Sequence, residues 1–301
     1  MRKTLKIVAI IIAATAVILA VLALSAGKLA ERKRNRVIEI RVAPVTFVSD
    51  MASIQRGKYL FESRGCMECH GESGGGQDVV NDPGGMFIRS PNISPGPGNI
   101  VKDYTEADWV RTIRHGVSPK KHPLTLMPSR DYNRMTDVDL ASLVAYVRNL
   151  QPAVGEGAVV RFPLIVNALY AFGQIKDDAE EIDHALPAPA PIPETVSVEH
   201  GAYVANLCAG CHGAGFSGGK IPGTPPDWPP ASNLTPGTGS VLPRYDTSEK
   251  FAAMLRTGKR PDGSAVSSVM PFPSLRNLNE TDVGAIYVFL KTLPAKPAGG
   301  R

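Results

Sequence analysis

Apolar side chains recur with helical spacing in two stretches that match each other in length and position. Residues 136–150 and 279–293 align without a gap, and both carry apolar residues at i, i+3, i+4 and i+7. The paired apolar positions are Leu140, Leu143, Val144 and Val147 in the first stretch and Val283, Ile286, Tyr287 and Leu290 in the second. Thr136 and Asn279 stand where helix N-caps are expected, and an aspartate follows each three residues later. The pattern predicts two equivalent amphipathic helices, each suited to packing on a neighbouring helix.

Shorter helical stretches precede both of these, in the same order. Residues 105–115 and 247–257 carry apolar i, i+4 pairs, and a glycine that favours a helix end follows each stretch. Still earlier, a short helix containing Gly-x-Tyr is expected at Gly57 and again at Gly201. The chain therefore repeats one plan twice.

This repeat sets the expected domain organisation. It predicts an all-α fold with two tandem domains, residues 50–152 and 196–294, joined by a linker over residues 153–195. Glycine and proline are frequent, with 29 and 26 residues, and aromatic content is only 6%, which indicates loop-rich units. The proline-rich end of the linker, residues 187–193, is expected to be a stiff spacer. Its apolar first part is expected to pack across the interface of the two domains and hold them close.

The N-terminal segment is apolar and uncharged from Ile7 to Gly27, which as a helix would be about 32 Å long. That length predicts a transmembrane helix. The alternative is a cleaved signal peptide, because the segment starts with basic residues and has small residues near Ala26. On the first interpretation, residues 1–36 form a membrane anchor with a basic flank.

The formal net charge of +5 comes from this flank. Residues 1–36 contain Glu31 as their single acidic residue, while the rest of the chain is nearly balanced in charge. The basic residues of the flank are Arg2, Lys3, Lys6, Lys28, Arg32, Lys33, Arg34 and Arg36. Such a distribution suits contact with lipid headgroups and gives no indication of nucleic-acid binding.

The four cysteines occur only in two Cys-x-x-Cys-His pentapeptides, residues 66–70 and 208–212. In this signature of covalent haem attachment, two thiols add to the haem vinyl groups and the histidine ligates iron. A zinc site would need further ligands, and a redox Cys-x-x-Cys does not require the histidine. The sequence predicts two covalently bound haem c groups, held by Cys66, Cys69 and His70 and by Cys208, Cys211 and His212.

Haem attachment by these motifs is expected on the outer, periplasmic side of a bacterial-type membrane. With the N-terminal helix crossing that membrane once, residues 37–301 would lie in the periplasm. The sequence therefore predicts a single-pass protein of the inner (cytoplasmic) membrane.

Both halves resemble the class I cytochrome c fold. The resemblance rests on the Gly-x-Tyr helix, Cys-x-x-Cys-His-Gly, an Asn-Ile/Leu-Ser/Thr-Pro loop within residues 90–96 and 231–237, Met-Pro, and a capped last helix. The chain is particularly similar to mono- and dihaem cytochromes related to the cytochrome subunits of membrane-bound bacterial alcohol and gluconate dehydrogenases. Those dehydrogenase subunits typically carry three haems, whereas this chain has two motifs.

The resemblance implies histidine and methionine as axial ligands of each iron. Met127-Pro128 and Met270-Pro271 follow the two motifs at nearly the same distance. The implied metal ligands are therefore His70, Met127, His212 and Met270. The remaining candidates, Met86, Met135 and Met254, are interpreted as residues that fill the core.

Histidines outside the motifs are given a different interpretation. His115 and His122 are expected to be polar surface residues or partners of haem propionates, with iron ligation as the alternative. His184 and His200 are expected to be exposed to solvent.

Iron with six ligands has no open position for a substrate, so no catalytic residue is assigned and electron transfer is predicted. The expected partners are a periplasmic or membrane dehydrogenase or quinol-oxidising complex, and a downstream oxidase or soluble cytochrome. One alternative is a haem enzyme with an open or labile iron, of the peroxidase or thiosulfate-oxidising type. A third interpretation, a docking subunit that passes electrons between complexes, is compatible with the first.

Overall fold

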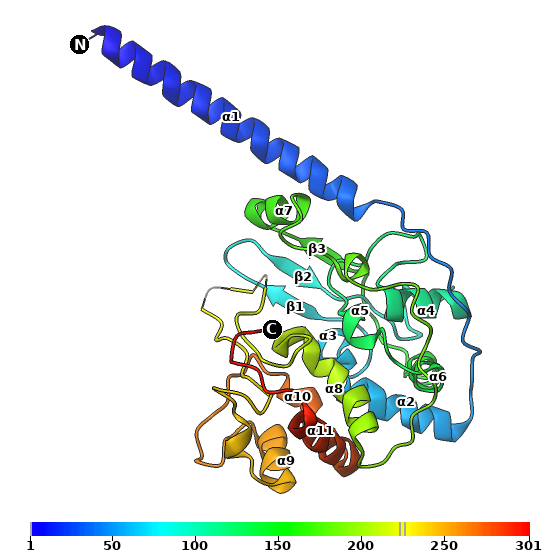
Figure 1. Ribbon diagram of the computed structural model, residues 1–301. Helices are drawn as coiled ribbons and strands as arrows, with labels where there is room; N and C mark the ends of the chain where they lie inside the picture. The colour runs from blue at the N-terminus through cyan, green and yellow to red at the C-terminus, as the bar shows by residue number, and fades with distance from the viewer. Residues whose placement is uncertain (1, 223, 226) are drawn as a thin grey trace.

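Helices dominate the computed structural model, which describes residues 2–222, 224–225 and 227–301 (Figure 1). A long helix, α1 (Arg2–Arg34), projects away from the rest of the molecule. The remainder holds two sets of helices that repeat one order. Each has an opening helix, a Cys-x-x-Cys-His turn, a middle helix, a short helix and a last helix.

The first set comprises α2 (Met51–Ser63), α3 (Cys66–His70), α4 (Glu106–His115), α5 (Ser129–Tyr132) and α6 (Asp137–Arg148). Thr136 caps α6 as predicted, because its side chain accepts a hydrogen bond from the backbone N–H three residues later, and Thr105 caps α4 in the same way. Helix α2 packs along α6. A Cβ atom at Gly57 would overlap the Ser142 carbonyl oxygen, so glycine permits this close crossing.

The second set comprises α8 (Val198–His212), a 3₁₀ turn (Leu242–Arg244), α9 (Ser248–Thr257), α10 (Phe272–Leu275) and α11 (Glu280–Thr292). Asn279 caps α11 by accepting a hydrogen bond from the Asp282 N–H, as predicted. Helix α8 packs along α11, and a Cβ atom at Gly201 would overlap the Ala285 carbonyl oxygen. The helix crossing of the first domain is thus repeated in the second.

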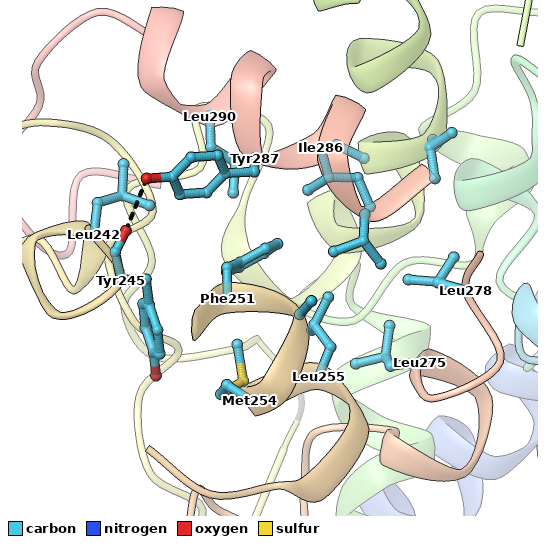
Figure 2. Packing of buried hydrophobic residues seen from close by; sticks show 14 of the residues in the cluster. Leu242, Tyr245, Phe251, Met254, Leu255, Leu275, Leu278, Ile286, Tyr287 and Leu290 are labelled. Carbon is cyan, nitrogen blue, oxygen red and sulfur yellow. Dashed lines mark hydrogen bonds between the residues drawn. The ribbon is translucent and has the colours of Figure 1, made fainter. Parts of the chain in front are cut away.

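Each domain buries its own hydrophobic core. In the second domain, Phe251 and Leu255 of α9 pack with Ile286 and Leu290 of α11, as Figure 2 shows. The Tyr287 hydroxyl donates to the Tyr245 carbonyl there (3.0 Å). The first domain has an equivalent core, which contains Leu60, Trp109, Leu140 and Val144. The predicted apolar stripes are therefore confirmed as the core-facing sides of α6 and α11.

The fold is mostly helical but not strictly all-α, because three short strands form one antiparallel sheet. They are β1 (Asp78–Asn81), β2 (Phe87–Arg89) and β3 (Val159–Arg161), in the order β1-β2-β3. The third strand comes from the linker. Its backbone N–H and C=O groups pair with β2, which belongs to a hairpin of the first domain. The spacing of apolar residues along the chain could not reveal this pairing.

The apolar part of the linker does not fill the interface of the two domains as expected. After β3 it forms α7 (Leu164–Ala171), which packs against α1, and Tyr170 is buried there. Ile165 and Phe172 remain exposed. A 3₁₀ turn (Asp178–Glu180) follows and contacts α5.

The basic end of α1 is bound to this linker. Arg36, just after α1, makes two hydrogen bonds of 2.7 Å to Asp177, which also accepts one from the Tyr170 hydroxyl (2.7 Å). Lys33 pairs with Glu180 at 2.9 Å. The flank predicted for lipid headgroups thus pairs with acidic residues of the protein itself.

The predicted transmembrane anchor is wrong. Across residues 2–222, 224–225 and 227–301, no helix combines the length with the apolar character that crossing a membrane requires. Helix length and the absence of charge between Ile7 and Gly27 are therefore not sufficient to identify a membrane span. The predicted location as a single-pass inner-membrane protein depended on this helix and is therefore also wrong.

Candidate functional site

Each Cys-x-x-Cys-His motif forms a helical turn at the end of its domain's opening helix. In the first domain, Gly65 interrupts the helix with a left-handed backbone (φ 87°), and the motif forms α3. In the second, α8 continues through Cys208 to His212 without interruption. None of the four cysteines forms a disulfide, so all four thiols are available for attachment. Because residues i and i+3 share a helix face, the two thiols of a motif lie on one side of the turn.

A backbone carbonyl orients the histidine of each motif. His70 Nδ1 lies 3.0 Å from the Pro91 carbonyl oxygen, and His212 Nδ1 lies 2.8 Å from that of Ser232. Nδ1–H is therefore the donor, which leaves the Nε2 lone pair available to a metal. Burial lowers the pKa of both imidazoles, although the hydrogen bonds act in the opposite direction. Both rings are neutral at neutral pH, as ligation requires.

A buried asparagine holds each carbonyl-bearing loop in place. Asn92 donates from Nδ2 to the carbonyls of Pro97 and Ala153, at 2.9 Å each. Asn233 donates in the same way to Lys296, at 2.8 Å. Both asparagines also accept two hydrogen bonds through Oδ1. The loops are thus fixed from within rather than by solvent.

Sequence reasoning missed the roles of the Pro91 and Ser232 carbonyls. A carbonyl acceptor exists at every residue, so no side chain marks its position. The asparagine that follows each carbonyl, Asn92 or Asn233, could have indicated these positions, because it occurs in both halves of the chain. In the sequence analysis it served only as part of the repeated loop motif.

The two predicted methionine ligands occupy matching positions. The carbonyls of Met127 and Met270 each accept a hydrogen bond of 2.8 Å from the N–H two residues later. The prolines that follow have almost the same backbone, with φ and ψ of −78° and 63° at Pro128 and −77° and 65° at Pro271. Cys66 and Met127 pack against the core of the first domain, while Cys208 and Met270 pack against that of the second. Each core therefore contacts both a thiol and a thioether.

The residues present fit a haem c group in each domain. Each domain offers two free thiols on one turn, an imidazole with an open Nε2, and a half-buried methionine. Before attachment, burial raises the pKa of the Cys66 and Cys208 thiols to about 12. This donor set matches the ligands of a covalently attached haem with His/Met coordination.

Among the other histidines, His115 and His200 lie in places that were not expected. His115 is buried rather than on the surface, and its Nδ1 lies 3.0 Å from His184 Nδ1. Burial lowers its pKa to about 4, so it is neutral. His122 contacts the Arg36 carbonyl.

His200 was expected to be exposed, but only 1% of its surface is accessible, and its Nε2 lies 2.7 Å from Asp282. The expectation failed because Asp282 is distant in sequence and approaches only when α11 packs on α8.

A cavity of about 650 Å³ opens elsewhere in the first domain, between the loop at residues 95–99 and the end of α6. Ile93 and Trp109 are among the residues that line it, whereas His70 and Met127 are not. The cavity is therefore separate from the predicted ligand set.

Two family descriptions match the chain, one for each domain. The family "Cytochrome C oxidase, cbb3-type, subunit III" matches residues 52–147, and the family "Cytochrome c" matches residues 198–294. Both haem motifs lie inside the matched ranges.

Curated relatives span both domains. The fructose dehydrogenase cytochrome subunit of Gluconobacter japonicus is 26% identical over 284 residues, which cover 83% of this chain and 54% of the relative. The cytochrome c subunit of alcohol dehydrogenase (quinone) from Gluconobacter oxydans is 25% identical over 287 residues, or 83% and 57%. A diheme cytochrome c-type protein of Cereibacter sphaeroides is 30% identical over 125 residues, or 38% and 42%. The chain thus spans about half the length of these relatives.

Proposed function

Because this chain is a dihaem class I c-type cytochrome with two covalently bound haem c groups, we propose that it relays electrons between a dehydrogenase and a downstream acceptor. The observation that carries the proposal is the duplicated site. Both domains present the same oriented histidine and the same Met-Pro backbone. Two equivalent centres in one chain suit transfer from one to the next.

In this proposal, Cys66, Cys69, Cys208 and Cys211 would form the thioether bonds, and His70 and His212 would each hold one iron through Nε2. Met127 and Met270 would supply the second protein ligand of each iron. When bound, haem c provides a reversible one-electron couple between ferric and ferrous iron. The carbonyls of Pro91 and Ser232 keep the imidazoles in the ligating tautomer.

Methionine ligation favours electron transfer over catalysis. A thioether stabilises ferrous iron and raises the reduction potential relative to a second histidine. It also occupies the position that a peroxide or sulfur substrate would need. The apolar cores beside Met127 and Met270 keep water away from that side.

We further propose a dehydrogenase as the electron donor. Two relatives that each align over 83% of this chain are named as cytochrome subunits of a fructose and an alcohol dehydrogenase. The acceptor would be a downstream oxidase, a soluble cytochrome or a quinone-linked complex of a respiratory chain.

A redox-titrated optical spectrum of the full-length holoprotein tests this function, together with a haem count and addition of carbon monoxide to the reduced form. We expect two haem c groups per chain, both low-spin and both unreactive with carbon monoxide. A haem that binds carbon monoxide would contradict the relay and support the enzyme alternative with an open iron.

A further inference from the structure

Two reciprocal tyrosine–aspartate hydrogen bonds join the domains. Tyr59, on the opening helix of the first domain, donates to Asp282 Oδ2 at the start of α11 (2.5 Å). Tyr203, on the opening helix of the second, donates to Asp139 Oδ2 at the start of α6 (2.6 Å). Both tyrosines belong to the Gly-x-Tyr repeat, and both aspartates are the third residue of a last helix. The contact therefore has approximate two-fold symmetry within one chain.

Each tyrosine also accepts a hydrogen bond from the opposite domain. The Asn279 N–H donates to the Tyr59 hydroxyl at 3.2 Å, and the Thr136 N–H donates to that of Tyr203 at 3.3 Å. Burial, with a contribution from the adjacent carboxylates, raises the pKa of both tyrosines to about 12. Both hydroxyls therefore stay protonated and keep donating at neutral pH.

The two aspartates are buried and depend on these partners. Asp139 is 6% exposed and Asp282 is 0% exposed. Arg56 pairs with Asp139 from within the first domain (2.9 Å), whereas Arg64 reaches across the interface to Asp282 (2.6 Å). A buried carboxylate is tolerated only when it is fully paired, so a shift of one domain against the other is strongly disfavoured.

The same interface places each haem-attachment turn against the other domain. Glu68 of the first motif accepts a hydrogen bond from the Ser274 N–H on α10 (2.8 Å). In the second motif, Gly210 lies against Asp131 on α5: a Cβ atom at Gly210 would lie 3.0 Å from both carboxylate oxygens. Glu68 and Gly210 hold the same position in their motifs, and Ser274 and Asp131 both lie four residues after a predicted methionine ligand. The geometry is reciprocal here too.

We infer that Tyr59 and Tyr203 are positioning residues for electron exchange between the two haem c groups. This inference rests on the proposed electron-transfer function. Each thioether-bearing turn contacts the segment that follows the other domain's methionine, through a hydrogen bond at Glu68 and a close approach at Gly210, so a short route between the centres crosses this contact. In the exchange, one electron leaves a ferrous centre, which becomes ferric, and reduces the ferric centre of the other domain. No bond is broken and no proton is transferred.

The hydroxyl groups act through geometry. Electron transfer slows steeply with the distance between redox centres, and the tyrosine–aspartate bonds fix that distance by fixing the two domains. Loss of one hydroxyl leaves the local fold of each domain intact but loosens the angle between them. The electronic coupling then falls even though each haem pocket is unchanged.

Tyr59→Phe, Tyr203→Phe and the double variant test the inference in the full-length holoprotein. Tyr287→Phe is the matched control, since it removes a buried hydroxyl that bonds only within the second domain, to Tyr245 and Asp246. Two quantities are measured: the rate of inter-haem exchange after photoreduction, and the coupled circular dichroism of the two haems in the Soret band. We expect each single variant to slow exchange at least two-fold, the double variant to slow it at least five-fold, and the coupled signal to shrink in parallel.

Tyr287→Phe should leave both quantities unchanged, even where it lowers the unfolding midpoint as much as the other variants do. An unchanged rate and an unchanged coupled signal in the single variants would overturn the inference, as would equal slowing in the control. The optical spectrum of the unmodified protein tests the proposed function separately. Two normal low-spin haems with an exchange rate insensitive to both tyrosines would retain that function and reject only the positioning role.

Discussion

The orientation of His70 and His212 is set by backbone, not by a neighbouring side chain. Substitution at Pro91 or Ser232 would leave the accepting carbonyl in place, so these positions are poor targets for mutation. The asparagines that anchor the loops are better ones. Asn92 is completely buried, and two of the four hydrogen bonds of its side chain reach the linker or the loop beyond residue 96.

Asn92→Ala and Asn233→Ala should each lower the free energy of unfolding by about 2–4 kcal/mol, because several buried polar groups lose their partners. Chemical unfolding of the holoprotein measures the loss. Asn99→Ala is the control, since Asn99 is half-buried and accepts one hydrogen bond, from the Val101 N–H (2.8 Å). A loss no larger than that of the control would show that the buried asparagines do not anchor these loops.

Met127→Leu and Met270→Leu should each open one iron. We expect one haem per chain to become reactive with carbon monoxide and its reduction potential to fall, while the other haem is unaffected. Met135→Leu is the control: Met135 is 6% exposed in the first core, where leucine fills similar space. A carbon monoxide titration of each reduced variant is the measurement. If Met127→Leu or Met270→Leu does not gain carbon monoxide binding, the substituted methionine is not an iron ligand.

Among the elements, the paired crossings of α2 with α6 and of α8 with α11 define each domain. Glycine at positions 57 and 201 lets the backbones of the two crossing helices come into contact. A larger residue at either position would press on a backbone carbonyl, which cannot move aside as a flexible side chain can. These crossings also place the opening helices where Tyr59 and Tyr203 can reach the opposite domain.

Gly57→Ala and Gly201→Ala should destabilise their domains by about 1–3 kcal/mol or more, the usual effect of overpacking. Thermal unfolding of the holoprotein is the measurement. Gly284→Ala provides the contrast, because the new Cβ atom on α11 would meet only Val196 side-chain atoms, at 3.3 Å, and alanine favours a helix. Equal destabilisation at positions 57 and 284 would argue against a backbone clash.

Elements with local signals were predictable from the sequence. Thr105, Thr136 and Asn279 cap helices because their side chains reach an N–H only three residues away. Features that depend on distant partners were not predictable: β3 needs the hairpin of the first domain, and His200 needs Asp282. The duplicated motifs indicated the residues of the site, but nothing in them revealed which surfaces of the two copies meet.

For the whole molecule, Asp282 is the junction between the domains. Arg64 and Tyr59 reach it from the first domain and His200 from the second. Burial alone would raise its pKa, but these partners outweigh burial and hold the pKa below the ordinary value of 3.8. The ionised carboxylate therefore contributes stability above pH 3.8, and this contribution is lost as the pH falls below that value toward the folded-state pKa.

Asp282→Asn should lower the free energy of unfolding at pH 7 by about 3–5 kcal/mol, because Arg64 is left buried without its counter-charge. The difference from the unmodified protein should shrink as the pH falls below 3.8 toward the lowered folded-state pKa, where the native carboxylate becomes protonated. Chemical unfolding at several pH values measures both effects. Asp103→Asn, at an exposed position, is the control and should have little effect at any pH. A loss in Asp282→Asn that does not vary with pH would contradict the ionic role.

The two-fold contact is imperfect at one point, where the first domain has Arg64 and the second has Asn206, each two residues before the first cysteine. Were two first domains from separate molecules to associate in this way, each Arg64 would face an Asp139 that Arg56 already neutralises. Two second domains would leave both copies of Asp282 without an arginine. Only the unlike pair satisfies every charge, so the tandem arrangement favours recognition within a molecule and discourages self-association between molecules.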